Sequence, residues 1–568
     1  MNKKMGVPLP QGCTVSGSTV NFSVAVPPEE KCELLLYKKG KKVPAVVIPM
    51  EESAMAGTLR FIELSLENTE EYEYNYRIGD EIVPDPYGKA FAGRNIWGKK
   101  CYAEKHEIRT RIIRDEFPWD GDRPLYLPAQ DVVAYSLHVR GFTRHSSSKV
   151  VHRGTFAGIM EKIPYILDLG VNQVQCMPVY EFEENLKYTN YWGYGEGFFF
   201  APKSAYASED AVCEMKLLVK TLHEAGIEIV LEMPFTEDTP QIMIIDCLRY
   251  WVMQYHIDGF IVNPLICDIN ALKKDAILGR TKISKKDDSF QRIMRCFLKG
   301  DEGMIPDVIW WLRHLEPEEE RFNYIAGHNG FTLYDVVSYD GKHNEANGEN
   351  NQDGPVYNYS WNCGAEGPSR KKTVTELRKK QIFNAFFLLL LAQGAPCILA
   401  GDEFANTQKG NNNVYCQDNA TAWLEWNKLE KEKELHTFVK KLIAFRRKHK
   451  LFHPDREMRG FDETSCGIPD VSYHGENAWQ IPSEVSSRQL GVFYHNSAEE
   501  NENCYVAYNM HWLPHTFALP TLPKGQKWYE AANTEEGILE KIRPLNKTRD
   551  ILLKERTIKV FVGKQEKL

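Results

Sequence analysis

The sequence predicts an α/β fold, a (β/α)8 TIM barrel flanked by an N-terminal and a C-terminal β-sandwich. Short β-rich segments separated by Gly and Pro occupy the first 120 or so residues. Strands and helices then alternate to about residue 450, which is typical of βα units around a parallel sheet. Short strands return after about Asp455. The 568 residues are therefore predicted to form three domains, at 1–120, 121–454 and 455–568.

The N-terminal region is predicted to be a sandwich because its strand-like segments are short and closely spaced. The predicted strands are Thr19–Val26, Cys32–Tyr37 and Phe61–Leu66. A loop rich in Gly and Pro, Ile82–Gly98, ends this region. The C-terminal region has the same pattern of short strand-like segments, with predicted strands at Leu490–Tyr494, Cys504–Asn509 and Thr557–Val562.

The central region alternates between the two kinds of element. The predicted strands are Asp131–His138, Val171–Val179, Gly226–Leu231 and Ile257–Val262, and the predicted helices are Thr155–Leu169, Met215–Ala225 and Ile242–Tyr255. The alternation runs too far for two repeats, so a closed barrel is the economical solution. A barrel of this kind has its active site at the carboxyl ends of the strands.

Composition excludes several classes of protein. Hydrophobic residues make up 43% and charged residues 26%, the mix of a globular chain. The net charge of -8 gives no electrostatic support for nucleic-acid binding. None of the 13 cysteines forms a CxxC pair, so we expect neither a metal site nor a redox motif, and no cofactor. The N-terminus lacks the apolar stretch of a signal peptide, and the longest apolar run, Ala385–Ala392, is too short to span a bilayer. We therefore expect a cytoplasmic protein without a membrane partner.

Motifs throughout the barrel region carry a family resemblance. They are Leu137–Thr143 followed by Gly154–Gly158, Asn190–Tyr194, Phe199–Pro202, Tyr334–Gly354, Ser360–Gly364, Gly401–Phe404 and Gly410–Asp418. Together they resemble glycoside hydrolase family 13, in its debranching branch of isoamylase, bacterial glycogen debranching enzyme and pullulanase. The resemblance covers nearly the whole chain. It implies an α-amylase-type barrel, a carbohydrate-binding N-terminal sandwich and an α-glucan ligand such as glycogen or a branched dextrin.

The resemblance also implies three catalytic carboxylates, and this chain departs from the family at each of them. Retaining glycosidases use a carboxylate nucleophile and a carboxylic acid roughly 5 Å away. The nucleophile position holds Asn263, and Ile261 replaces the Arg that precedes it by two residues. The transition-state aspartate is replaced by Asn329, and Ser284 is the best alignment for the acid. An amide cannot form the glycosyl ester, so the sequence predicts a scaffold without the family's chemistry.

Two functions follow from these observations. The first is a catalytically deficient α-glucan-binding or regulatory protein, for which an active debranching enzyme is a candidate partner. The second is an active glycosidase that hydrolyses α-1,6 branches through displaced carboxylates. Glu232 and Glu237 follow the third predicted barrel strand and are the candidates for such a pair, although drift after loss of catalysis is the favoured explanation for them.

Five residues are candidates for substrate binding: Tyr194, His138, His328, Trp192 and Glu232. The aromatic rings of Asn190–Tyr194 could stack on glucose or could pack the loop against the barrel. The two histidines lie at predicted strand ends, where a structural hydrogen bond is the alternative role. The Asn-rich loop His343–Asp353 could line a glucan cleft or could serve only to hold backbone turns.

Overall fold

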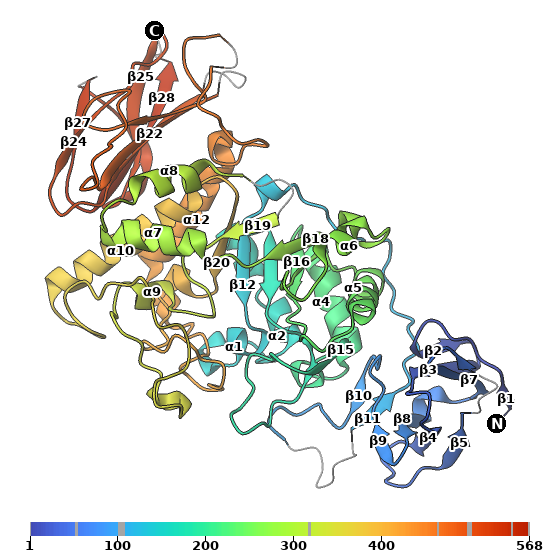
Figure 1. The fold of residues 1–568 in the computed structure, drawn as a ribbon. Helices are drawn as coiled ribbons and strands as arrows, with labels where there is room; N and C mark the ends of the chain where they lie inside the picture. The colour runs from blue at the N-terminus through green and yellow to red at the C-terminus, as the bar shows by residue number, and fades with distance from the viewer. Residues whose placement is uncertain are drawn as a thin grey trace. The chain divides into compact units, whose positions relative to one another are not determined.

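The computed structural model describes residues 2–50, 55–99, 108–315, 320–462, 465–496, 502–546 and 549–565. Its central feature is a closed barrel of seven strands among these residues (Figure 1). In barrel order the strands are β12 (Ala134–Leu137), β13 (Gln173–Cys176), β16 (Glu228–Glu232), β17 (Gly259–Ile261), β18 (Lys282–Lys285), β19 (Glu320–Asn323) and β20 (Ala395–Leu399). β12 pairs in parallel with β20, and β16 with β17. The predicted fold class is confirmed.

The barrel has seven described strands where eight were predicted, and the difference lies between β18 and β19. The described residues there form α7 (Ser289–Lys299) and α8 (Ile305–Arg313) in succession, without an intervening strand. β18 instead pairs directly and in parallel with β19, with Ser284 opposite Glu320 and Lys285 opposite Arg321. Two consecutive helices therefore take the place of one βα unit.

The other helices cover the barrel strands or connect them. They are α1 (Val139–Thr143), α2 (Phe156–Met160), α3 (Ile163–Leu169), α4 (Ala211–Glu224), α5 (Gln241–Tyr255), α6 (Ile269–Lys274), α9 (Leu333–Val336), α10 (Lys372–Leu390), α11 (Lys428–Lys431) and α12 (Lys433–Lys448). The predicted helix Thr155–Leu169 is divided into α2 and α3, and Pro164 in the first turn of α3 is compatible only with a helix start. The apolar run Ala385–Ala392 ends the buried α10, and the buried β20 follows, as predicted.

The N-terminal region is all-β and forms two antiparallel sheets. One contains β1 (Lys3–Lys4), β2 (Gly12–Ser16), β3 (Thr19–Ala25), β6 (Met55–Ala56) and β7 (Leu59–Ser65). The other contains β4 (Cys32–Lys38), β5 (Val46–Pro49), β8 (Tyr72–Ile78), β9 (Glu81–Val83), β10 (Phe91–Ala92) and β11 (Arg109–Arg111). Side chains of both sheets, such as Phe22 and Tyr74, share one buried core, so the sheets pack face to face.

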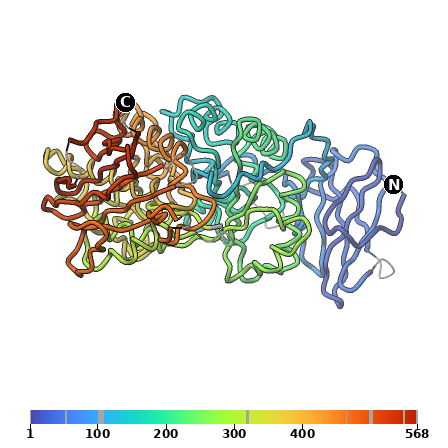
Figure 2. The backbone as a smooth tube through the Cα atoms, turned by 90° about the horizontal axis from the view of Figure 1, so that it is seen from above, coloured from blue at the N-terminus to red at the C-terminus, as the bar shows by residue number. Residues whose placement is uncertain are grey.

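The C-terminal region is also antiparallel. Its larger sheet contains β21 (Val471–His474), β22 (Gln489–Asn496), β23 (Glu502–Asn509), β25 (Gln526–Asn533), β26 (Gly537–Pro544) and β28 (Thr557–Gln565). A smaller sheet pairs β24 (His515–Ala518) with β27 (Asp550–Leu553). The larger sheet contacts α10 and α12, and Figure 2 shows the backbone of this C-terminal region in orange and red. The Thr534 hydroxyl donates to Asn384 Oδ1 at 2.6 Å.

Two compact units can be distinguished in the chain. The first comprises Met1–Leu125, His138–Lys162 and Cys176–Thr281, and the second comprises Tyr126–Leu137, Ile163–Gln175 and Lys282–Leu568. They divide the chain differently from the three predicted domains, whose boundaries near residues 120 and 454 stay a prediction.

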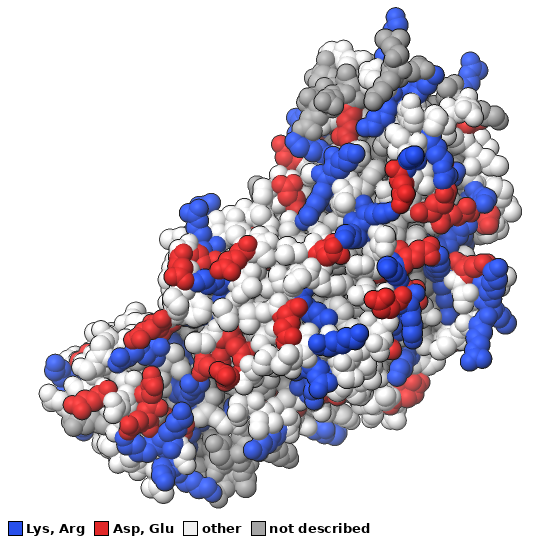
Figure 3. All heavy atoms as spheres, turned by 180° about the vertical axis from the view of Figure 1, so that it is seen from behind, with Lys and Arg blue, Asp and Glu red and all other residues white. Residues whose placement is uncertain are grey.

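The surface carries charges of both signs. Acidic and basic side chains are interspersed on the face shown in Figure 3. Of the described helices, none combines the length and the apolar character that crossing a bilayer requires.

A buried ion cluster holds the hairpin that leads to the loop Asn190–Tyr194. This hairpin pairs β14 (Tyr180–Phe182) with β15 (Gly197–Pro202). Lys203 Nζ lies 2.8 Å from Glu181 Oε1 and 2.6 Å from Glu184 Oε2, and all three side chains are nearly inaccessible to solvent. Arg94, from the loop after β10, contacts the same two carboxylates at 3.2 Å. Burial alone would raise the pKa of Glu181, but Lys203 and Arg94 hold it below its ordinary value.

We predict that Lys203→Met lowers the free energy of unfolding by about 3 kcal/mol or more, because removing one partner leaves buried carboxylates without compensation. Denaturant unfolding followed by fluorescence measures this change. Lys187→Met, at an exposed lysine between the same two strands, is the matched control and is expected to change stability by less than about 0.5 kcal/mol. Equal stabilities of the two variants would contradict the prediction.

Candidate functional site

The site is built from residues that follow the carboxyl ends of the barrel strands. His138 follows β12, Glu232 ends β16, Asn263 follows β17 by two residues, and Ser284 lies near the end of β18. His328 and Asn329 follow β19. In a parallel barrel the carboxyl ends of the strands share one face. That these residues converge on that face is therefore a prediction from the topology. The two units are described in turn.

In the first unit, Tyr194 and Glu232 form a direct pair. The Tyr194 hydroxyl donates to Glu232 Oε1 at 2.5 Å. Burial, with the Glu232 charge beside it, raises the pKa of Tyr194 well above its ordinary value, so the phenol keeps its proton. Trp192 is only 5% exposed and packs edge-on against the Tyr194 ring, with centroids 5.6 Å apart. Tyr194 itself is half-buried, so it is the more accessible of the two rings.

The loop that carries these rings is held by its own polar groups. The Asn190 side chain accepts from Gly193 N at 3.0 Å and donates to Tyr194 O at 2.9 Å. Gly193 has φ of +82°, and a Cβ there would lie 2.4 Å from the Phe182 ring, so only glycine fits. The Tyr180 hydroxyl donates to Gly193 O at 2.8 Å. The ring of Tyr194 is therefore presented by a rigid turn.

His138 has structural partners at both ring nitrogens. Its Nδ1 accepts from Gly141 N at 3.0 Å, which caps α1. Its Nε2 lies 2.8 Å from Tyr191 O and 3.2 Å from the Tyr206 hydroxyl. The sequence left two roles open for His138, substrate binding and a structural hydrogen bond, and these contacts favour the structural one.

Asn263 is exposed and occupied by its own turn. Its side-chain oxygen accepts from Leu265 N at 3.0 Å, as in an Asx turn. Ile261, at the position where the family resemblance implies Arg, ends β17 and is 6% exposed. Glu237 is exposed five residues beyond Glu232. In this unit Glu232 and Glu237 thus lie at and after the end of β16, with Asp238 next to Glu237, and neither Asn263 nor Ile261 supplies charge.

In the second unit, the group that faces His328 is Lys286. Its Nζ lies 3.2 Å from Nε2 and 3.3 Å from Nδ1 of His328. Ser284, which the sequence suggested for the acid position, is 2% exposed, and its hydroxyl has no hydrogen-bond partner among the described residues. Asn329 is exposed beside His328. The sequence analysis missed Lys286, which is exposed and follows the end of β18 by one residue.

The Asn-rich loop His343–Asp353 is tied to the segment Gly410–Asp418 by buried amides. Asn344 Nδ2 donates to Asn412 Oδ1 at 2.8 Å, and Asn412 Nδ2 donates to Asn358 Oδ1 at 2.8 Å. Asn344 and Asn412 are fully buried. Buried side chains cannot line a glucan cleft, so these two amides have a structural role.

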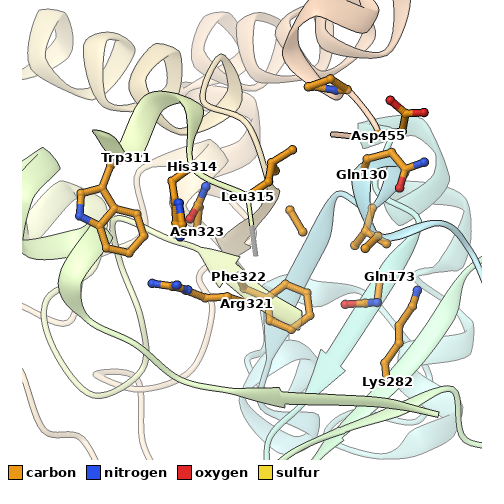
Figure 4. Close-up of a pocket in the computed structure, with 15 residues that line it drawn as sticks. Gln130, Gln173, Lys282, Trp311, His314, Leu315, Arg321, Phe322, Asn323 and Asp455 are labelled. Atoms are coloured by element: carbon orange, nitrogen blue, oxygen red, sulfur yellow. The ribbon is translucent and has the colours of Figure 1, made fainter. Parts of the chain in front are cut away.

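A well-formed cavity of about 200 Å³ in the second unit belongs to the opposite end of the barrel (Figure 4). Gln173, Lys282 and Ala395 line it, and each is the first residue of its strand. Because active sites of such barrels lie at the carboxyl ends, this cavity is not the candidate active site. Among the described residues no cluster of three metal-ligating side chains occurs.

Comparison with known proteins gives close relatives. No protein-family model matches the chain. Isoamylase 1, chloroplastic, of Arabidopsis thaliana is 30% identical over 594 residues, covering 82% of this chain and 74% of the relative. The glycogen operon protein GlgX homolog of Mycobacterium tuberculosis is 30% identical over 581 residues, covering 79% and 80%. The glycogen debranching enzyme of Erwinia tasmaniensis is 30% identical over 573 residues, covering 79% and 85%.

Solved structures with the same fold are pullulanases and a glycogen-degrading module. The catalytic module of the pneumococcal protein SpuA has a TM-score of 0.78 at 17% identity, covering 98% of this chain and 97% of that one. A mutant pullulanase from Paenibacillus barengoltzii complexed with maltotriose has a TM-score of 0.75 at 18% identity, covering 98% and 96%. These structures support the fold, and the sequence relatives support the family. The chain therefore belongs to the isoamylase and glycogen-debranching family, the debranching branch of glycoside hydrolase family 13.

Proposed function

We propose that this chain is an α-glucan-binding member of the family that does not perform the retaining glycosidase reaction. The observation that carries the proposal is the absence of a carboxylate at each of the three positions Asn263, Ser284 and Asn329. A regulatory role beside an active debranching enzyme, in the cytoplasm, belongs to the same proposal.

The chemistry of these side chains supports it. The retaining reaction forms a glycosyl ester on a carboxylate and needs a protonated acid for the leaving oxygen. The Asn263 amide carries no negative charge, and its oxygen already accepts from Leu265 N. A serine hydroxyl is far too weak an acid to replace a carboxylic acid at neutral pH.

The charge beside His328 supports it as well. Lys286 brings an ammonium to within 3.3 Å of both ring nitrogens. The transition state of the family reaction is oxocarbenium-like, with positive charge developing on the sugar, and an ammonium at this place does not stabilise that charge. The Lys286 ammonium beside His328 therefore opposes the family reaction.

Glucan binding needs accessible aromatic rings, and the structure offers them outside the N-terminal sandwich. Among the described residues up to 99, no aromatic side chain is exposed, and only Tyr72 and Trp97 are half-buried. By contrast, Tyr357 is 78% and Tyr359 38% exposed in a loop of the second unit. Buried groups fix this loop, since Asn412 donates to Pro355 O at 2.9 Å and Arg295 to Asn358 O at 2.9 Å. We propose Tyr357 and Tyr194 as stacking residues.

A second candidate function is an active debranching hydrolase, and the names of the relatives favour it. Isoamylase and glycogen debranching enzyme are names of enzymes. In this chain the reaction would need Glu232 and a second carboxylate such as Glu237 to act as the pair. Glu232 is half-buried and already accepts from Tyr194, so it would have to exchange that partner during turnover.

We predict that the purified chain releases no reducing ends from glycogen, amylopectin or pullulan above background. Loss of a complete catalytic unit costs on the order of 10⁶ in turnover in a well-studied hydrolase. A reducing-end assay beside an active isoamylase measures this. Turnover within about a hundredfold of that enzyme, abolished by Glu232→Gln but not by Glu224→Gln at an exposed position of α4, would support the second candidate instead.

We predict that the chain is retarded in a native gel containing glycogen, and that Tyr357→Ala weakens this binding about two- to tenfold. That range corresponds to the worth of one aromatic contact. Tyr357→Phe keeps the ring and is expected to bind like the original chain. Phe461→Ala, which removes another exposed ring, is the control. Identical migration with and without glycogen would show that glucan binding is absent.

A further inference from the structure

A thiol, an imidazole and an amide come together in the C-terminal region, and none of them belongs to the candidate site. Cys466 is exposed, and its Sγ lies 3.4 Å from His495 Nε2. His495 Nδ1 lies 2.8 Å from Asn503 Oδ1. His495 on β22 and Asn503 on β23 are directly opposite each other in the antiparallel register, and both are buried. The sheet thus holds the His495 imidazole and the Asn503 amide next to the accessible thiol of Cys466.

The hydrogen-bond directions in this cluster are determined by a fourth residue. Asn503 Nδ2 donates to Gln526 Oε1 at 2.8 Å, which leaves Asn503 Oδ1 facing the imidazole. An amide oxygen only accepts, so His495 Nδ1 carries the proton of the neutral ring. His495 Nε2 then presents its lone pair toward the Cys466 thiol. This is the arrangement of a nucleophile, a base and a group that orients the base.

We propose that Cys466 is a reactive thiol that exchanges with small disulfides, with His495 as its base and Asn503 as a positioning residue. The His495 Nε2 lone pair takes the thiol proton while Sγ attacks one sulfur of the disulfide. A bond forms between Sγ and that sulfur, and the disulfide's own S–S bond breaks. The departing thiolate takes the proton back from the imidazolium, so one thiol and one disulfide give one mixed disulfide and one thiol.

The surroundings favour thiol exchange over acyl transfer. An acyl-transfer site needs free N–H groups near the nucleophile for the oxyanion. Here Cys466 N and Gly467 N donate to the Asp462 carboxylate at 3.0 Å and 2.6 Å. The thiol also lies 3.5 Å from Ile468 O, a second acceptor for its proton. The two backbone amides nearest the thiol are thus already occupied, and no free N–H group at these positions is left for an oxyanion.

Cys213 provides a matched comparison within the same chain. Cys466 and Cys213 are the exposed cysteines among the described residues. Cys213 lies in α4, where partial burial and the charge of Asp210 raise the pKa of its thiol. The raised pKa itself slows Cys213, so the difference between the two rates has to be tested for its dependence on His495.

The test uses the full chain with glutathione disulfide as the probe. After timed reaction and acid quenching, peptide mass spectrometry gives the rate of mixed-disulfide formation at each cysteine. We expect Cys466 to react at least about tenfold faster than Cys213, because general-base assistance contributes a factor of this size or more. A rate at Cys213 that equals or exceeds the rate at Cys466 would overturn the proposal.

Three variants distinguish assistance by a base from simple accessibility of the thiol. His495→Gln is expected to bring the ratio of the two rates to about one, with the Cys213 rate unchanged as the internal check of folding. Asn503→Leu is expected to lower the Cys466 rate, and Asn503→Asp, which retains an acceptor for Nδ1–H, to restore most of it. A ratio that survives His495→Gln, or an Asn503→Asp variant as slow as Asn503→Leu, would refute the assigned roles.

Discussion

The candidate site of the first unit depends on two buried cations. Lys203 and Arg94 share the carboxylates of Glu181 and Glu184, and these groups anchor both strands of the β14–β15 hairpin. The turn with Asn190, Gly193 and Tyr194 lies between those strands, so its geometry depends on the hairpin. Charges buried this completely are tolerated only when every partner is in place. The position of the Tyr194 ring is thus determined by electrostatics some residues away from it.

The sequence predicted the fold class because its signals are periodic and local. Alternating strands and helices identified the barrel, and the apolar run before Gln393 identified α10 and β20. It failed where a local signal was missing. A helical pattern over Thr155–Leu169 does not show that Pro164 starts a new helix, and motif alignment does not show that α7 and α8 follow one another without a strand. The eighth strand was expected from the class rather than from residues.

Chain order predicts which residues of the site follow strand ends, but it does not predict their contacts. Those contacts depend on the direction of each side chain. Lys286 lies one residue beyond the end of β18, and only the structure shows that it reaches His328. The cluster of Cys466, His495 and Asn503 was invisible in the sequence, since strand register rather than spacing brings these residues together.

The difference between buried and exposed polar groups explains how a well-formed scaffold is compatible with the proposed loss of the catalytic carboxylates. Asn344 and Asn412 are fully buried and hydrogen-bonded, so replacing either would leave unsatisfied partners at a cost of about 1–3 kcal/mol each. Asn263 and Asn329 are exposed at strand ends, where water satisfies an amide as well as a carboxylate. The stability of the fold therefore constrains the residue type strongly at Asn344 and Asn412 and weakly at Asn263 and Asn329. A barrel of this kind can exchange its catalytic groups without losing its structure, and only a functional requirement would retain them.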